Sequence, residues 1–351
     1  MGWEQTRPKP KIKKKLDKQR PFGVVLLYCP YMYDMLTIGD IKLDVFISLD
    51  RCSDKCDLQR NKVCFDFGEK ISVDLQDQQV AGSAPNVAVA LTRLGKKTAV
   101  LSNMGQDQTQ KLAIEFLQKE GVETTYIKTY KGIASAYSAV LNLQGEKTIL
   151  TAYVLESYHL PKQVKTKWFY LSEMGNGYEK LYKELVRRIK RDKTHLGFNP
   201  GNQQIRELKP ELYDLIKDTT VLFVNVEEGQ RIIKNRRVGI KTLAERLYKL
   251  GPEEVIITDG RNGAYGYDGT NLYKIPIFPG PRIEATGAGD SFASAYLGAK
   301  MHGLSMAEGL RWGTVNSAEV VLHIGPTRGL LTHRQIELRL KKNPKHQAQV
   351  I

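Results

Sequence analysis

The sequence predicts an α/β protein in which helices cover both faces of a mostly parallel sheet. In the second half of the chain, short apolar segments alternate with amphipathic stretches of helical spacing. That alternation is typical of parallel sheets, because each crossover between parallel strands places a helix on the sheet. Two strand-rich regions, 44–80 and 133–153, do not follow the alternation. We expect them to form a small separate sheet.

In the first half, organised sequence begins at Met35. Residues 41–49 alternate apolar and polar side chains, and this period of two predicts a strand. Residues 86–94 carry apolar side chains at helical spacing and predict an amphipathic helix. Further along we expect a buried strand at 99–102, an amphipathic helix at 108–120, and two strands within 135–153 that are joined by a turn at 144–146.

The second half supplies most of the predicted main sheet. We expect strands at 168–172, 196–199, 221–226 and 254–258, and helices at 178–191, 204–217 and 229–250. The pair Asp268-Gly269 predicts a hairpin, because Asp-Gly suits the turn that joins twisted antiparallel strands. Residues 288–340 are expected to be mostly helical.

Composition divides the chain into segments and indicates its cellular compartment. Residues 1–31 are basic and lack apolar periodicity, so we expect a disordered extension, followed by one domain over 32–340 and a basic tail at 341–351. The net charge of +15 favours anionic partners such as nucleotides, although general solubility is the preferred explanation. Four cysteines are too few for a disulfide scaffold and predict a cytoplasmic protein. No apolar run is long enough to span a membrane.

The turn Thr286-Gly287-Ala288-Gly289-Asp290 precedes an expected helix. Glycines at a helix start expose backbone N–H groups, and the helix dipole adds positive potential, which together suit a phosphate. An anion there would repel a carboxylate, so Asp290 is expected to have another role, such as accepting a hydroxyl proton. A plain glycine turn capped by Asp290 is the alternative.

A second motif, Ala81-Gly82-Ser83-Ala84-Pro85-Asn86, precedes the helix expected at 86–94. Gly82 allows close backbone approach. Asn86 can donate and accept hydrogen bonds at once, as a polyhydroxylated ligand requires. A helix cap is again the alternative explanation.

Two more motifs directly follow expected strands. Asn225 and Glu228 come after strand 221–226, and oxygen-bearing side chains at the carboxyl end of a parallel strand suit hydrated Mg²⁺. The segment 258–263, with Thr258, Gly260 and Gly263, follows the next strand, where nucleotides commonly bind in open α/β sheets.

Taken together, these motifs resemble the PfkB carbohydrate kinases, the ribokinase-like family, over about residues 33–335. The first family signature matches at Ala81-Gly82, Asn86, Ala88, Gly95 and Gly105, and the second at Gly287-Ala288-Gly289-Asp290. Asn225-x-x-Glu228 matches the family's Asn-x-x-Glu, and Gly39 with Asp44 matches its sugar-binding pair near the amino end. The sequence departs from the family at Glu284-Ala285, where Asp-Thr is usual.

The resemblance implies a ribokinase-like fold with a small β lid, and an ATP-dependent kinase that phosphorylates a hydroxymethyl group of a small sugar or related compound. It implies that Asp290 is the general base. The implied binding residues are Gly287, Ala288 and Gly289 for the anion hole, Asp44, Gly82 and Asn86 for the substrate, Asn225, Thr258, Gly260 and Gly263 for the nucleotide, and Asn225 with Glu228 for Mg²⁺ held through water.

Two other functions stay open at this point. One is a nucleoside kinase of the same family. The other is a non-catalytic ribokinase-fold protein that regulates a partner or binds nucleic acid, which the basic extension favours and the intact Asp290 opposes. We expect a sugar or nucleoside as the partner, neither a membrane nor nucleic acid, and a homodimer formed through the lid.

Overall fold

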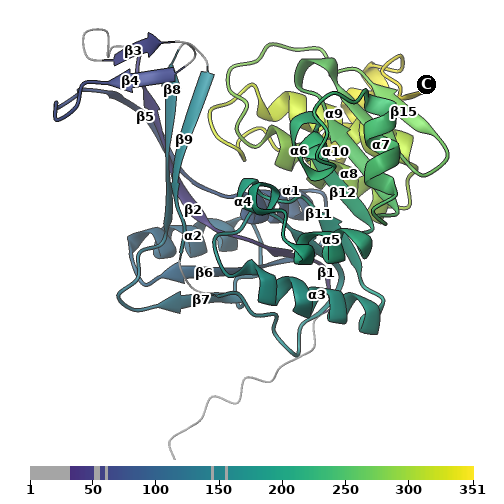
Figure 1. Ribbon diagram of the computed structural model, residues 1–351, viewed down its shortest axis with the longest axis horizontal. Coiled ribbons are helices and arrows are strands. Elements are labelled where there is room, and N and C mark those ends of the chain that lie inside the picture. The colour runs from purple at the N-terminus through teal and green to yellow at the C-terminus, as the bar shows by residue number, and fades with distance from the viewer. Residues whose placement is uncertain (1–31, 51–55, 60–61, 144–145, 155–156) are drawn as a thin grey trace, which may run out of the picture. The chain divides into compact units, whose positions relative to one another are not determined.

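The computed structural model describes residues 32–351 except 51–55, 60–61, 144–145 and 155–156 (Figure 1). The extension expected at 1–31 and most of the turn expected at 144–146 lie outside the described residues. No helix in the described part of the chain combines the length and the apolar character that crossing a bilayer requires.

The main sheet has ten strands within the described residues, in the order β16-β15-β14-β13-β12-β11-β10-β1-β6-β7. The strands from β13 to β7 are parallel, and β14, β15 and β16 are added antiparallel at one edge. The mostly parallel sheet is therefore confirmed. The strands are β1 (Met32–Ile38), β6 (Thr98–Gly105), β7 (Ile127–Tyr130), β10 (Lys165–Leu171), β11 (His195–Phe198), β12 (Val221–Asn225), β13 (Glu254–Thr258), β14 (Ala264–Tyr267), β15 (Leu272–Ile275) and β16 (Gln349–Val350).

Helices cover both faces of this sheet, as predicted. Neighbouring residues of a strand point to opposite faces, so Phe169 and Val224 lie in one core while Tyr170 and Phe223 lie in the other. The first core contains residues of α3, α5 and α7, and the second contains residues of α1, α8 and α9. The helices are α1 (Ser83–Arg93), α2 (Gln108–Lys119), α3 (Tyr178–Asp192), α4 (Asn202–Glu207), α5 (Pro210–Lys217), α6 (Val226–Ile232), α7 (Ile240–Tyr248), α8 (Ala288–Met301), α9 (Met306–Val320) and α10 (His333–Lys342).

The small separate sheet is also present, and we call it the lid. Its strands are β5 (Asp74–Ala81), β2 (Lys42–Ser48), β8 (Ala136–Leu143) and β9 (Glu146–Ala152), in that order. Figure 1 shows them extending away from the main sheet, with the hairpin β3 (Cys56–Gln59) and β4 (Lys62–Phe65) near their far end. The lid strands arise from the two regions, 44–80 and 133–153, that broke the alternation in the sequence.

The period of two at 41–49 gives the lid two different faces. Asp44, Phe46 and Ser48 are buried on one face, which we call the inner face. Leu43 and Ile47 lie on the opposite, outer face and are only half-buried.

Two helix predictions were wrong in their extent. The helix expected at 204–217 is divided into α4 and α5, because Pro210 begins a new helix and Leu208 adopts a left-handed φ of 48°. The helix expected at 229–250 is divided into α6 and α7, with Lys234 left-handed between them. The segment 341–351, expected as a tail, contains the end of α10 and the strand β16.

Candidate active site

The residues expected to carry chemistry meet at one edge of the main sheet, where the parallel strands end. Asp40 follows β1 and Glu173 follows β10, while Asn225 and Thr258 end the paired strands β12 and β13. The amino ends of α1 and α8 begin near the same edge, since Asn86 of α1 contacts Asp290 of α8. Ligands of open α/β sheets bind at this edge, so the topology itself selects the region.

Asp290 lies in the first turn of α8 and is held by a residue from a distant part of the chain. The Asn86 side-chain amide donates a hydrogen bond to the Asp290 carboxylate at 2.8 Å. Burial raises the pKa of Asp290, and hydrogen bonds from Asn86 and Ser83 act against that rise. The two motifs that the sequence singled out independently are therefore parts of one site.

The glycines of the α8 turn differ in what surrounds them. Gly287 caps α8 with φ of 76°, and an added Cβ there would lie 2.5 Å from the Pro326 Cβ. A Cβ added to Gly289 would meet nothing within 4 Å. Gly287 therefore shapes the turn, whereas Gly289 leaves open space in front of the helix start.

Asp44 reaches the site from the inner face of the lid. Burial raises its pKa to about 6, and the Asp290 and Glu173 carboxylates add to the rise while Lys42 and Ser138 oppose it. Within the part of the chain that the structure describes, its carboxylate oxygen Oδ1 is buried without a hydrogen-bond partner, and so is Oδ1 of Asn86. Buried acceptors are normally satisfied, so these two oxygens would gain from a ligand or a water that supplied donors.

Gly82 has a packing role in the structure. Its φ is 116°, and an added Cβ would lie 2.2 Å from the Asp40 carbonyl oxygen. The absence of a side chain thus lets the start of α1 pack against the backbone that follows β1. Gly82 also lies close to Asn86, one of the expected substrate-binding residues. Its own contact with substrate remains a prediction.

The structure adds a partly buried ion pair that the sequence did not predict. Lys42 of β2 donates to Glu173 at 2.8 Å, and the Tyr153 hydroxyl donates to the other Glu173 oxygen at 2.8 Å. The Glu173 pKa is lowered, because Lys42 and these hydrogen bonds outweigh its burial. Glu173 directly follows a correctly predicted strand, so the rule that selected Asn225 would also have found it.

Asn225 and Glu228 form a capping box at the start of α6. The Asn225 side chain accepts from the Glu228 N–H at 2.9 Å, and the Glu228 carboxylate accepts from the Asn225 N–H at 2.8 Å. Burial raises the pKa of Glu228. Among the described residues, no three His, Cys, Asp or Glu side chains lie close enough to bind a metal directly. A cation held by Asn225 and Glu228 would therefore keep most of its water shell, as Mg²⁺ prefers.

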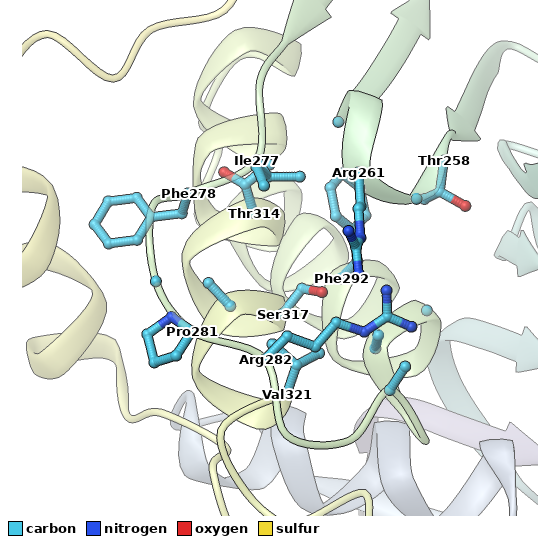
Figure 2. A pocket seen from close by; sticks show the side chains of 17 residues that line it. Thr258, Arg261, Ile277, Phe278, Pro281, Arg282, Phe292, Thr314, Ser317 and Val321 are labelled. Atoms are coloured by element: carbon cyan, nitrogen blue, oxygen red, sulfur yellow. The ribbon is translucent and has the colours of Figure 1, made fainter. Parts of the chain in front are cut away.

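A pocket of about 250 Å³ lies between the β13–β14 turn, the loop before α8 and helix α9. Thr258, Gly260 and Gly263 line it, as do Ala288 and Gly289 of the α8 turn. Figure 2 shows Phe278 and Pro281 on one side of the pocket and Thr258 on the other. Asn225 is not part of this lining in the described chain but is paired with Thr258 across β12 and β13.

Two arginines also line this pocket, and the sequence reasoning did not select them. Arg261 comes from the β13–β14 turn and Arg282 from the loop before α8. Figure 2 shows both side chains extending over the middle of the pocket. In the described part of the chain neither has an acidic partner, so the pocket beside the α8 turn is positively charged.

Glu284, which replaces the family's usual Asp, is buried and is used within the protein. It accepts hydrogen bonds from the N–H groups of Thr286 at 2.6 Å and Gly325 at 3.1 Å, and it pairs with Lys147 of the lid strand β9. The Lys147 ammonium also donates to the Thr286 hydroxyl at 2.8 Å. The longer carboxylate thus connects the lid to the segment that precedes the α8 turn.

A doubly covered parallel sheet, a glycine-rich helix start beside a positively charged pocket, and polar side chains gathered at the inner face of a lid are typical of a phosphotransferase that acts on a small alcohol. A family model described as "pfkB family carbohydrate kinase" matches residues 46–333. The chain belongs to this family, and it is a sugar or nucleoside kinase whose family uses ATP as the phosphate donor.

Individual relatives are distant. The 5-dehydro-2-deoxygluconokinase of Clostridium tetani is 23% identical over 307 residues, which cover 78% of this chain and 87% of the relative. The structure of Arabidopsis thaliana ribokinase with ribose and ATP aligns with a TM-score of 0.74 at 18% identity, over 89% of this chain and 99% of that one. The structure of Burkholderia thailandensis nucleoside kinase with inosine aligns with a TM-score of 0.73 at 19% identity, over 89% of this chain and 99% of that one.

Proposed function

We propose that this protein transfers the γ-phosphate of ATP to a hydroxymethyl group of a small sugar, with Asp290 as general base and the N–H groups of the α8 turn as anion hole. The observation that supports this most is the Asn86–Asp290 hydrogen bond. It joins the half-buried Asp290 carboxylate to Asn86 of α1, and Gly289 leaves open space at the start of the same helix α8. A base must lie between the acceptor hydroxyl and the phosphate it attacks.

The two substrates occupy the two sides of Asp290 in this proposal. Asp44 and Asn86 hold sugar hydroxyls with their unpartnered oxygens, and Gly82 lies beside them. On the other side, Thr258, Gly260 and Gly263 line the nucleotide pocket, and Asn225 is paired with Thr258 on the neighbouring strand. Arg261 and Arg282 attract the phosphates, as expected for cations that have no acidic partner in the described chain and lie beside a helix start.

The reaction then follows from these positions. Asp290 takes the proton of the sugar hydroxyl as the oxygen bonds to the γ-phosphorus, and the bond from that phosphorus to the ADP oxygen breaks. The N–H groups at 287–289 and the α8 dipole stabilise the negative charge of the transferring group. Mg²⁺, when bound through water by Asn225 and Glu228, would offset phosphate charge. The chain's own residues supply orientation and proton transfer.

A nucleoside kinase is the second candidate. A nucleoside presents the same hydroxymethyl group on its ribose, and the nucleoside kinase with inosine is as similar in fold as the ribokinase. An ADP-release assay against neutral sugars and nucleosides decides between them.

The catalytic proposal is tested with Asp290→Asn, which keeps the side-chain shape and can still contact Asn86. Removing a general base should lower kcat by about 10²–10⁴-fold and change the binding constants of ATP and sugar little. A near-normal kcat in this variant would refute the role of Asp290. Absence of turnover by the unaltered protein on every compound would instead favour the non-catalytic alternative.

We also propose that two copies associate through the lid. Leu75, Tyr137 and Leu150 are exposed, and the strand register places them with Leu43 and Ile47 on the outer face. An apolar sheet face of this kind is typical of a protein interface. The cytoplasmic location stays a prediction that rests on the sparse cysteines.

A further inference from the structure

We propose that the nucleotide pocket recognises the phosphates of its nucleotide through Arg261 and Arg282 and makes no base-specific contact, so that guanosine and inosine triphosphates serve as phosphate donors alongside ATP. The inference rests on the proposed kinase function and extends the range of donors at the same site. It follows from the chemistry of the side chains that line the pocket, all of which belong to the described part of the chain.

The first argument is the distribution of charge in the pocket. Of the 17 residues that line it, Arg261 and Arg282 carry the only charged side chains. Both are exposed, and the described chain places no carboxylate on either of them. Two like charges in one cavity gain from an anion that binds both, and a guanidinium can donate two parallel hydrogen bonds to a phosphate. The phosphate chain is identical in all nucleoside triphosphates, so this recognition does not depend on the base.

The second argument is that Arg282 emerges from a fixed backbone beside the α8 turn. The N–H groups of Ile283 and Glu284 donate to the Val321 carbonyl at 2.8 and 3.1 Å. The chain next to Arg282 is therefore held against the end of α9, and two residues of the α8 turn line the same pocket. The positive helix start and the arginines thus act together on the phosphate end of the nucleotide.

The rest of the pocket offers the base an apolar surface. Ile277, Phe278 and Pro281 come from the loop before α8, and Ala318 and Val321 come from the end of α9. Figure 2 shows Phe278 and Pro281 on the side of the pocket away from Thr258. Stacking and apolar contacts tolerate different bases, because every base has a π-face. This surface therefore holds adenine and guanine alike.

The hydroxyl groups of the pocket do not separate the two bases. Adenine carries an amino donor where guanine carries a carbonyl acceptor, so strong discrimination needs a fixed polar partner. Within the described chain, the lining contains no Asn, Gln, Asp, Glu or His. The Thr314 hydroxyl is engaged by the Arg311 carbonyl at 3.0 Å and by the His346 Nε2 at 2.8 Å. The hydroxyls of Ser317 and Thr258 can rotate to donate or accept, so neither rejects either base.

The backbone of the loop before α8 is likewise not fixed in a pattern that selects one base. Pro279 and Pro281 have no N–H group to donate. Residues 276–282 make no backbone–backbone hydrogen bond with any described residue. The remaining N–H and C=O groups are therefore not held in one arrangement, whereas strong discrimination depends on partners that are fixed in advance.

The first test compares donors on the full chain with Mg²⁺ and the best acceptor found among sugars and nucleosides. ATP, GTP and ITP are the donors. We expect kcat/KM for GTP and for ITP to lie within about tenfold of the value for ATP, since a fixed partner would separate them by about 10⁴-fold. A preference for ATP of more than about tenfold over either would overturn the inference and leave the kinase proposal intact.

Arg261→Gln and Arg282→Gln test the recognition of the phosphates by calorimetric titration with ADP and GDP. We expect each variant to bind both nucleotides at least about tenfold more weakly, and by the same factor, because a charge-assisted hydrogen bond is lost while the base contacts stay. Melting temperatures should not change, since both side chains are exposed. If either variant keeps its affinity, or if the loss differs between ADP and GDP, the inference is refuted.

The matched control is Arg246→Gln, the same change at an exposed arginine of α7. Helix α7 packs on the face of the main sheet opposite to α8 and α9, so both affinities should stay unchanged.

The same titrations separate the two proposals. If no acceptor is phosphorylated but ADP and GDP bind with similar dissociation constants, the kinase proposal fails and the recognition by phosphates stands. If neither nucleotide binds, or if ADP binds more than about tenfold more tightly than GDP, the inference is refuted whatever the turnover.

Discussion

The buried carboxyl of Asp44 gives the protein a defined pH dependence. Burial raises its pKa to about 6, and in our proposal its ionised form accepts hydrogen bonds from sugar hydroxyls more strongly than the protonated form does. We predict that kcat/KM for the sugar falls about tenfold per pH unit below about pH 6 and is level above it. Asp290, whose pKa burial also raises, contributes to the same decline. Initial rates at low sugar concentration between pH 5 and 8 measure this, and a flat profile would contradict it.

The stability contributed by the same groups changes with pH in the opposite direction. Burial raises the pKa of both Asp40 and Asp44 from 3.8 to about 6. The folded protein therefore keeps protons that the unfolded chain has lost. Their contribution to stability is fully present below about pH 3.8 and is lost as the pH rises through about 6. We therefore expect that protonation of Asp40 and Asp44 at pH 5 lowers the activity without lowering the melting temperature.

The two glycines of the α8 turn should fail differently when substituted. Gly289→Val places a side chain into open space, so we predict a normal melting temperature and an ATP KM raised by at least about tenfold. Gly287→Ala puts a Cβ against Pro326 at a left-handed φ, which should cost at least about 1–2 kcal/mol of stability. Thermal denaturation and ATP kinetics of both variants make the comparison, and equal ATP KM values in the two variants would contradict the proposed anion site.

Single residues were predictable where a motif carried the information. Asn86 and Asp290 were both selected from local patterns, and the structure brings them together although they are 204 positions apart. Lys42 and Glu173, separated by 131 positions, were not paired in advance. Nothing in the sequence around an isolated lysine shows which distant carboxylate it will meet. Glu284 was recognised as a departure, but its lysine partner in the lid was not.

At the scale of elements, the contact between β9 and the α8 segment predicts coupling between the lid and the reaction. Lys147→Met removes the only lid cation that the described structure pairs with Glu284. We predict a kcat lowered by about tenfold and a larger share of ATP lost to hydrolysis, because a loosened lid excludes water less well. ADP release measured with and without sugar gives both quantities.

The control is Lys147→Arg, which keeps the charge and should retain most of the coupling. Glu284→Gln and the double variant complete a mutant cycle, in which the double variant should be no worse than the more severe single one. Additive effects on kcat would show that Lys147 and Glu284 act separately.

The elements themselves were largely predictable because their patterns are local. The strand at 254–258 and the helix at 178–191 match β13 and α3 almost completely. The two divided helices were missed because apolar spacing continues across each break. Pro210 marks the first break, but Lys234 shows no signal in its side chain for the left-handed conformation that interrupts the second.

For the molecule as a whole, the outer lid face predicts an oligomer. Leu150→Lys replaces a side chain 57% exposed on that face. We predict a change from dimer to monomer in light scattering, with little change in melting temperature, because a charge at a buried interface is costly while an exposed one is not. Leu338→Lys on α10, at a leucine 48% exposed, is the matched control. A monomeric unaltered protein would contradict the proposal.

The architecture of the whole chain was the easiest feature to predict. Alternating strands and helices specify a parallel sheet with few alternatives, and the strands left over specify a second sheet. The order of the edge strands was not predictable. In particular, β16 contains two residues and joins the sheet only through its pairing with β15.

That small strand has a practical consequence for anyone who handles the protein. Its two residues cover one border of the ten-stranded sheet, and the Ile351 N–H also donates to the Leu272 carbonyl at 2.9 Å. Trimming these last residues would leave the backbone groups of β15 ready to join another chain edge to edge, which is a common route to aggregation. A tag or fluorescent fusion should therefore leave residues 349–351 unaltered, so that β16 stays in place.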